Sequence, residues 1–127
     1  MDNDAREIAR RLNEAQRIAK IGSWEHDLLT NCVRWSDEVF RIFEIDPARS
    51  GASYEAFVDV VHPDDRAAID QVYRDSLIKK IPYEITYRAL MPDGRIKWVS
   101  EHCESSFDAA GTVLRSVGTV QDITQQM

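Results

Sequence analysis

The sequence predicts an α+β fold in which one antiparallel sheet carries helices on one face. Three observations predict it. The second half of the chain holds three long strand-like segments, which are joined by the tight-turn sequences MPDG and DAAG. Two shorter alternating segments open the domain, and three helical patterns follow them. The resulting order of two strands, three helices and three strands is typical of an α+β domain.

The composition bounds the class of protein. A chain of 127 residues with 43% hydrophobic and 30% charged residues suits one soluble domain with one core. The 22 acidic and 16 basic residues give a net charge of −6, which argues against nucleic acid or an anionic membrane as the main partner. The sequence has no apolar run of membrane-spanning length and no secretory signal. Cys32 and Cys103 form no metal-binding spacing, so we expect reduced thiols, no metal site and a cytoplasmic protein.

Residues 3–20 are predicted to form an amphipathic helix, and we assign residues 1–20 to an N-terminal segment that is a candidate for dimerisation. Its apolar positions follow the 3-4-3-4 spacing of a dimer seam; they are Ala5, Ile8, Leu12, Ala15 and Ala19. Little more than two heptads would be marginally helical alone in water. The helix is therefore expected to pack either on its own domain or on a second copy.

The next elements are two short strands and two short helices. SWEHDLL alternates with Trp24, His26 and Leu28 on one face, and CVRWS forms the second strand after a turn at TN. DEVFRIFEI predicts a helix that Ser36 or Asp37 caps and that Pro47 ends, and SYEAFVDVV predicts a helix that Ser53 caps.

The stretch VVHPDDRAAI resembles a metal-binding or acid/base site, because His62 stands close to Asp64 and Asp65. A metal or acid/base role would need partners elsewhere, and no second cluster of His, Cys or Asp at ligand spacing appears in the sequence. Pro63 fits the first turn of a helix, and two carboxylates there meet the positive end of the helix dipole, worth roughly 0.3–1 kcal/mol each. We therefore interpret the stretch as the start of the third helix, whose apolar stripe is formed by Ala67, Ala68, Ile69, Val72, Tyr73, Leu77 and Ile78.

The last three strands form a meander. PYEITYRAL predicts a strand whose core face carries Tyr83, Ile85, Tyr87 and Ala89. RIKWVSEHCESSF and TVLRSVGTVQDIT are the next two strands. Gly94 and Gly111 stand in the two turns, where a positive φ is expected.

Five pieces of the chain carry a family resemblance: IGSWEHDL, VRWSDEVFRIFEIDP, VHPDDR, YEITYRALMPDGRIKWV and GTVQDIT. In this order they resemble a PAS domain of the bacterial sensory-box type, the subtype with HPDD and DIT motifs, over residues 21–124. The resemblance implies a five-stranded antiparallel sheet flanked by short helices, with a small cavity between them. It also implies a sensory or dimerising module that is attached to a histidine kinase or a diguanylate cyclase.

The resemblance places a cavity between the sheet and the short helices. The residues expected to line it are His26, Phe40, Phe43, Phe57, Tyr87, Val99, Glu101, Cys103, Ser116 and Val120. A buried Glu101 needs a partner, and His26 is one possibility. Tyr87 and Cys103 are expected mainly as core residues. Trp98 would then face outward, where the N-terminal helix could cover it.

Two cofactors, flavin and haem, are known in the family that the sequence resembles. Flavin-binding light sensors carry a cysteine on the helix that follows the short helices, but the helix starting at Pro63 has none and Cys32 lies near the first strands. Haem-binding members need an axial histidine facing the cavity; His62 is poorly oriented for this role, and His26 and His102 lie on strands. We therefore expect no tightly bound cofactor.

The resemblance also implies an output junction at the end of the last strand, formed by Asp122, Ile123 and Thr124. Asp122 would hold it through hydrogen bonds and Thr124 would cap a following helix, so residues 125–127 would begin a linker to a C-terminal effector. Three functions are weighed: a homodimeric two-component-type signalling module that senses a small molecule or relays dimer rearrangement, a ligand-free dimerisation module, and an enzyme. The sequence has no phosphate loop, catalytic triad or paired acid/base spacing, so we expect no enzymatic activity.

Overall fold

The computed structural model describes residues 2–127 and has the predicted α+β fold. The elements are, in chain order, α1 (Asp2–Ala19), β1 (Ile21–Asp27), β2 (Cys32–Trp35), α2 (Asp37–Phe43), α3 (Tyr54–Val60), the 3₁₀ turn η1 (Pro63–Asp65), α4 (Arg66–Lys79), β3 (Tyr83–Leu90), β4 (Ile96–Phe107), β5 (Val113–Asp122) and the 3₁₀ turn η2 (Thr124–Gln126). No helix within these residues is both long enough and apolar enough to span a bilayer.

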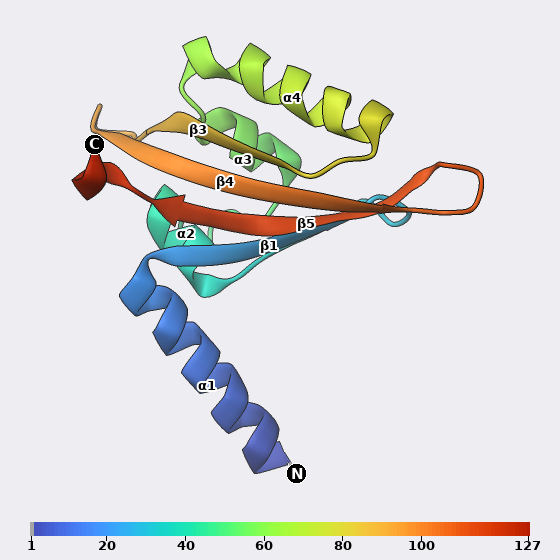
Figure 1. Ribbon diagram of the computed structural model, residues 1–127. Helices are drawn as coiled ribbons and strands as arrows, with labels where there is room; N and C mark the ends of the chain where they lie inside the picture. The colour runs from blue at the N-terminus through green and yellow to red at the C-terminus, as the bar shows by residue number, and fades with distance from the viewer. Residues whose placement is uncertain (1) are drawn as a thin grey trace.

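The five strands form one antiparallel sheet in the order β2-β1-β5-β4-β3 (Figure 1). The first and last long strands are neighbours, with Ile21 opposite Gln121. This pairing places the end of α1 beside the end of β5. The predicted meander β3-β4-β5 is confirmed, and Gly94 and Gly111 take φ values of 93° and 87° in its two turns.

On the inner face of the sheet, buried side chains recur at alternate positions of the strands. On β4, Val99, Glu101 and Cys103 are buried, and on β5, Ser116 and Val120 are buried. The apolar core joins these strands to α2, α3 and α4; it comprises Val39, Ile42, Phe43, Val60, Val61, Ile69, Tyr87, Ala89, Met91, Val99 and Val120. Because successive side chains of a strand point to opposite faces, every second residue of each strand faces the helices.

The ends of the short helices are set by local hydrogen bonds. Ser53 accepts a hydrogen bond from the Ala56 N–H at 3.0 Å, which confirms the predicted cap of α3. Ser36 occupies the N-cap position of α2, but its hydroxyl accepts from the Ser23 N–H at 3.0 Å and so joins α2 to β1. The prediction that Pro47 ends α2 is wrong, because Glu44 adopts a left-handed conformation that closes the helix at Phe43.

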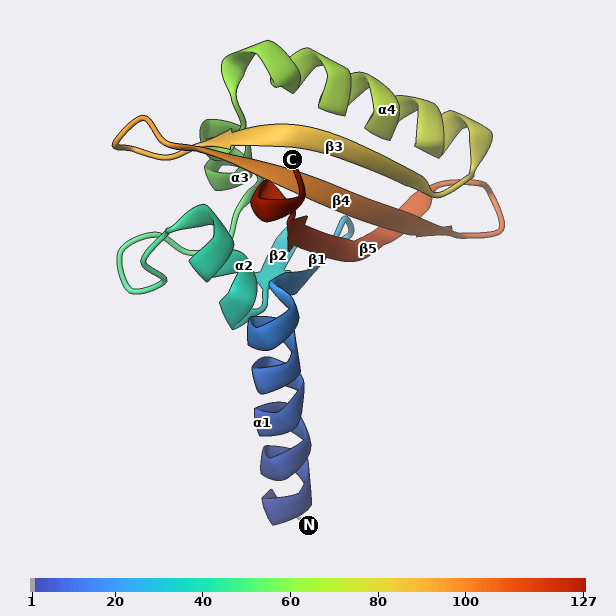
Figure 2. The same cartoon turned by 60° about the vertical axis from the view of Figure 1, so that its left-hand side comes forward.

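Helix α1 extends away from the rest of the domain (Figure 2). All five positions of the predicted seam are exposed, and Ile8 and Leu12 keep 59% and 58% of their surface. The expectation that α1 covers Trp98 is wrong. The Arg88 guanidinium lies over the Trp98 ring instead, 5.9 Å from its centroid, because Arg88 is its direct neighbour on β3.

Candidate functional site

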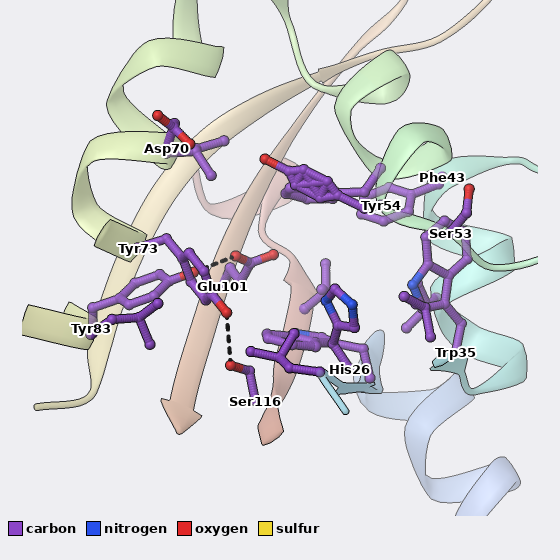
Figure 3. A pocket seen from close by; sticks show the side chains of 18 of the residues that line it. His26, Trp35, Phe43, Ser53, Tyr54, Asp70, Tyr73, Tyr83, Glu101 and Ser116 are labelled. Atoms are coloured by element: carbon purple, nitrogen blue, oxygen red, sulfur yellow. Dashed lines mark hydrogen bonds between the residues drawn. The ribbon is translucent and has the colours of Figure 1, made fainter. Parts of the chain in front are cut away.

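A cavity of about 370 Å³ lies between the inner face of the sheet and helices α2, α3 and α4 (Figure 3). Its wall combines aromatic and aliphatic side chains with a few polar ones. It is formed by Trp24, His26, Leu28, Val33, Trp35, Val39, Phe43, Ser53, Tyr54, Phe57, Ile69, Asp70, Tyr73, Arg74, Leu77, Tyr83, Glu101, Ser116 and Val120. Small-molecule sites in proteins typically have this size and mixture.

One end of the cavity is polar because a carboxyl group is buried there. Glu101 is 4% exposed, and its carboxylate accepts hydrogen bonds from the Tyr87 hydroxyl at 3.2 Å and from the Tyr83 hydroxyl at 3.3 Å. Burial raises the pKa of Glu101 to about 7, although the two tyrosine bonds act in the opposite direction. The same burial, together with the nearby Glu101, raises the pKa values of both tyrosines. Glu101 can therefore change its charge near neutral pH.

A second hydrogen-bonded group lies beside Glu101. The Tyr73 hydroxyl of α4 lies 3.0 Å from the Ser116 hydroxyl of β5, as Figure 3 shows. Ser116 is also 2.8 Å from the Ser105 hydroxyl of β4. These hydroxyl groups can donate or accept by rotation. These hydrogen bonds connect α4 to the sheet at the polar end of the cavity.

The other end of the cavity is aromatic. The rings of Trp35, Phe43 and Phe57 follow one another, with centroids 5.7 Å and 6.3 Å apart. Trp24 forms part of the wall, and its indole lies over Gly118, where a Cβ atom would come within 2.9 Å of the ring and 1.8 Å of the His102 carbonyl oxygen. The Trp24 Nε1–H is buried without an acceptor among the described residues. A donor in this state is costly unless water or a ligand accepts its hydrogen bond.

The structure brings six of the ten expected residues to the cavity wall: His26, Phe43, Phe57, Glu101, Ser116 and Val120. The other four expectations need correction. Phe40 lies outside the wall, because its position on α2 turns it against Trp35, with ring centroids 5.1 Å apart. Tyr87 lies behind Phe57, whose ring stands at 89° to its own, and behind Glu101.

Val99 and Cys103 are the other two residues that do not reach the wall. Val99 is fully buried and pairs with Tyr87 across the sheet. Cys103 lies between Tyr83 and Gly118 on the neighbouring strands, and burial raises the pKa of its thiol to about 11. Both are core residues, and Cys103 is an inert thiol at neutral pH.

Helix α4 supplies much of the cavity wall, although the sequence predicted no residue of this helix there. Ile69, Asp70, Tyr73, Arg74 and Leu77 recur at helical spacing and face the cavity. Three of them belong to the apolar stripe seen in the sequence. The stripe predicted a buried face, but it held no signal that this face lines a hollow.

The possible pairing of His26 with Glu101 is wrong. The His26 Nε2 lies 2.9 Å from the Asn31 side-chain oxygen in the β1–β2 turn. Glu101 takes its two hydrogen bonds from tyrosines on β3 instead. Figure 3 shows His26 and Glu101 as separate parts of the wall.

The segment after β5 is a compact hydrogen-bonded turn. One carboxylate oxygen of Asp122 accepts from the Thr124 N–H at 3.0 Å and from its hydroxyl at 2.6 Å. The Thr124 hydroxyl oxygen accepts from the Trp98 N–H at 3.0 Å, and the Ile123 N–H donates to the Trp98 carbonyl at 2.8 Å. The expectation that Thr124 caps a following helix is wrong here, because Ile123 is at the N-cap of η2 and Thr124 is its first residue.

The fit of the two family cofactors depends on the histidines and cysteines near the wall. Among residues 2–127, no group of three His, Cys, Asp or Glu side chains could hold a metal ion, and no cysteine lines the cavity. His62 Nδ1 accepts the Asp64 N–H at 3.1 Å at the start of η1. The wall therefore lacks the cysteine of a flavin–cysteine adduct, and its histidine, His26, has its Nε2 2.9 Å from the Asn31 side-chain oxygen.

Comparison with known proteins gives relatives in signalling. The chain is 28% identical over 119 residues to the probable diguanylate cyclase DgcE of Escherichia coli, covering 94% of this chain and 11% of the cyclase. It is 24% identical over 106 residues to the sensor protein FixL of Bradyrhizobium diazoefficiens, covering 84% of this chain and 21% of FixL. It thus spans a small fraction of the length of these relatives.

The fold is similar to solved sensor domains. A sensory box histidine kinase/response regulator from Burkholderia thailandensis superposes with a TM-score of 0.75 at 23% identity, covering 91% of this chain and 86% of that one. The N-terminal domain of a diguanylate cyclase with PAS/PAC sensor from Marinobacter aquaeolei gives 0.71 at 21% identity, with 84% and 97% covered. The family model described as PAS fold matches residues 32–120, which is more than half of the sequence, and this chain therefore belongs to the PAS-fold family.

Proposed function

We propose that this chain is a sensory PAS module of a larger signalling protein, of the histidine kinase or diguanylate cyclase type, and that its cavity binds a small molecule. The observation that carries the proposal is the cavity of about 370 Å³ with an aromatic end and a polar end. The sensor protein and the diguanylate cyclase among its relatives support the signalling role.

The polar groups of the wall support a ligand rather than an empty core. The Trp24 N–H is buried without an acceptor among the described residues, and Glu101 is a buried carboxyl group at the wall. Such groups are costly in a purely structural core. A ligand or bound water that completes their hydrogen bonds would remove this cost.

The test compares a substitution that fills the cavity with a matched substitution on the surface. Leu77 lines the cavity, whereas its neighbour Ile78 is 79% exposed. Leu77→Trp and Ile78→Trp each add an indole to α4. In a thermal-shift screen of small aromatic fragments, we expect hits on the original chain and on Ile78→Trp, and no hits on Leu77→Trp. Equal hits on Leu77→Trp would place binding elsewhere, and a screen without hits on a folded original chain would contradict the ligand-binding role.

The second candidate function is a dimerisation module that relays rearrangement without a ligand. The exposed apolar stripe of α1 favours it, because an amphipathic helix of 18 residues that extends away from its domain is marginal in water without a partner. We propose that a second copy of the chain covers this stripe, in either function. Native mass spectrometry with an absorption spectrum separates the two: excess mass on the dimer indicates a sensor, and a bare dimer indicates a relay.

A further inference from the structure

The charge of the cavity wall indicates what kind of molecule it accepts. The charged groups of the wall are Glu101, Asp70 and Arg74. Asp70 and Arg74 form an ion pair with a distance of 2.9 Å, and both side chains are largely exposed at 45% and 69%. Glu101 is buried, and no basic residue among those described lies within ion-pair distance of it. The wall therefore contains one buried acidic group whose hydrogen-bond donors are only hydroxyl groups.

The aromatic part of the wall also favours a positively charged ligand. Aromatic faces attract cations through their π-electrons, and a cation enclosed by several rings is held more strongly as it loses water. The cavity presents seven aromatic side chains: Trp24, Trp35, Phe43, Tyr54, Phe57, Tyr73 and Tyr83. A buried carboxyl group beside aromatic rings is suited to an ammonium group on an apolar body. It is unsuited to a carboxylate, which would meet Glu101 with like charge.

We propose that the ligand of this cavity is a small organic ammonium ion with an aromatic body, whose ammonium group binds the Glu101 carboxylate and whose body packs on the aromatic walls. This inference rests on the proposed function and adds the chemical class of the ligand. A bound ammonium group would supply the missing positive partner of Glu101, and the hydroxyl groups of Tyr83 and Tyr87 would keep the carboxylate in place.

The proposal predicts a pH dependence with a fixed sign. Because burial raises the pKa of Glu101 to about 7, the carboxylate form increases about tenfold between pH 6 and pH 8. A simple alkylammonium ion keeps its charge over this range. Affinity for it should therefore rise about tenfold from pH 6 to pH 8, while affinity for a neutral molecule of the same shape should not rise.

The other titratable groups of the cavity wall and its surroundings come from several elements. They are Tyr83 and Tyr87 on β3, Cys103 on β4, Tyr54 on α3, Tyr73 with the Asp70–Arg74 pair on α4, and His26 on β1; the β5 residues of the wall, Ser116 and Val120, do not titrate. The pKa values of the four tyrosines and of Cys103 are all raised by burial, away from this range. Loss of the carboxylate in Glu101→Gln should therefore remove the pH dependence of the affinity.

The experiment is calorimetric titration of the purified chain with three molecules that share one aromatic body: phenethylamine, 2-phenylethanol and phenylacetate. At pH 8 we expect phenethylamine to bind about tenfold tighter than 2-phenylethanol, and phenylacetate to bind weakest. Glu101→Gln should remove the preference for the amine. Glu104→Gln, an exposed position on the same strand, should keep it.

The outcomes separate this inference from the proposed function. If the alcohol binds as tightly as the amine, or if phenylacetate binds tightest, the ammonium class is wrong while a ligand-binding cavity stands. If none of the three binds, the inference is also wrong, and the fragment screen with Leu77→Trp decides independently whether the cavity binds any ligand. If Glu101→Gln does not fold, the affinity of the unchanged chain for phenethylamine at pH 6 and at pH 8 decides whether the ammonium class is right.

Discussion

The Asp65 carboxylate joins the start of α4 to strand β3. It accepts three hydrogen bonds from Arg88: from the backbone N–H at 2.8 Å, from Nε at 3.0 Å and from Nη2 at 2.8 Å. The His62 N–H also donates to the Arg88 carbonyl at 2.9 Å. The Arg88 guanidinium holds the pKa of Asp65 below its usual value. Both sides of this contact are partly buried, at 21% and 29% exposure, so the pair is more than a surface ion pair.

Asp65→Asn should destabilise the fold by roughly 1–3 kcal/mol, because an amide cannot accept the same three charge-assisted bonds. Chemical denaturation at pH 7 measures this loss. The pH dependence of this stabilisation follows from the lowered pKa of Asp65. The advantage of the carboxylate is fully present above the ordinary value of 3.8, and it disappears as the pH falls through the lowered pKa of the folded state.

Asp64→Asn is the matched control for this prediction. Asp64 stands next to Asp65 in η1, but its side chain is 77% exposed. If the helix dipole were the main effect, both changes would cost similar amounts, on the order of 0.3–1 kcal/mol. Equal losses would therefore contradict the assignment of the larger effect to Arg88.

Single residues also show what the sequence could predict. Local spacing identified HPDD as a helix start, and the family resemblance placed Glu101 inside. The sequence did not predict that Asp65 binds Arg88 or that tyrosines bind Glu101. Tyr83 and Tyr87 lie 18 and 14 residues from Glu101 and reach it through the β3–β4 register. Asp65 lies 23 residues from Arg88 and reaches it because Val61 bridges to Ala89.

At the scale of elements, strands were predicted better than helix faces. Alternation determined which side of β3 faces the core, because successive side chains point to opposite faces. On β4 the pattern left both faces open, and the family resemblance placed Val99, Glu101 and Cys103 inside. For α4 the apolar stripe predicted a buried side, but the cavity beneath Tyr73 and Leu77 depends on how far the helix stands from the sheet. That spacing is set by packing across the whole domain, which no local pattern records.

Helix α1 gives the prediction at this scale. Its seam residues Ile8 and Leu12 are exposed, and if a second copy covers them, Leu12→Glu should convert a dimer into a monomer. Sedimentation velocity at several protein concentrations measures this change. The loss should amount to about tenfold or more in the dimer dissociation constant, since a charge enters an apolar contact.

Asn13→Glu is the control, because it adds the same charge one position away, outside the seam. It should leave the dimer in place. A dimer that persists in Leu12→Glu would mean that another surface holds the copies together, and equal weakening by both variants would indicate a general effect of charge.

At the scale of the whole molecule, the end of α1 and the end of β5 meet at one end of the inner strands β1 and β5. The Asp122 N–H donates to the Lys20 carbonyl at 3.0 Å, where α1 ends, and β1 pairs with β5 beside it. Figure 1 shows the start of β1 and the C-terminus on the same side of the domain. A rearrangement of α1 in a dimer would therefore act directly on the segment that leaves β5.

The global fold was predictable because five short pieces occur in one order, and each piece is tied to a local feature such as a turn glycine or a helix start. The projection of α1 was not predictable. Its thin apolar stripe fits a domain surface as well as a second helix, and the sequence alone left both open. The choice depends on which surface of the domain is already covered, and this is a property of the assembled fold.

The last prediction concerns output through Asp122. In a protein that joins this chain to a histidine kinase or a diguanylate cyclase, Asp122→Ala should reduce the control of the enzyme severalfold while the domain stays folded, with a melting temperature within about 5 °C. The reason is that one carboxylate oxygen orders the Thr124 turn, which is bonded to Trp98. Enzyme activity with and without the stimulus, beside thermal unfolding, measures both effects.

Asp108→Ala is the matched control for Asp122→Ala. One Asp108 carboxylate oxygen accepts from the Ala110 and Thr112 N–H groups, each at 2.9 Å, so it orders a similar turn between β4 and β5. Because this turn lies at the opposite end of β5 from the exit of the chain, its loss should leave control of the enzyme intact. Unchanged control in Asp122→Ala, or equal loss in both variants, would mean that the signal does not pass through the bonds of Asp122 and Thr124 and reaches the enzyme by another route, such as α1.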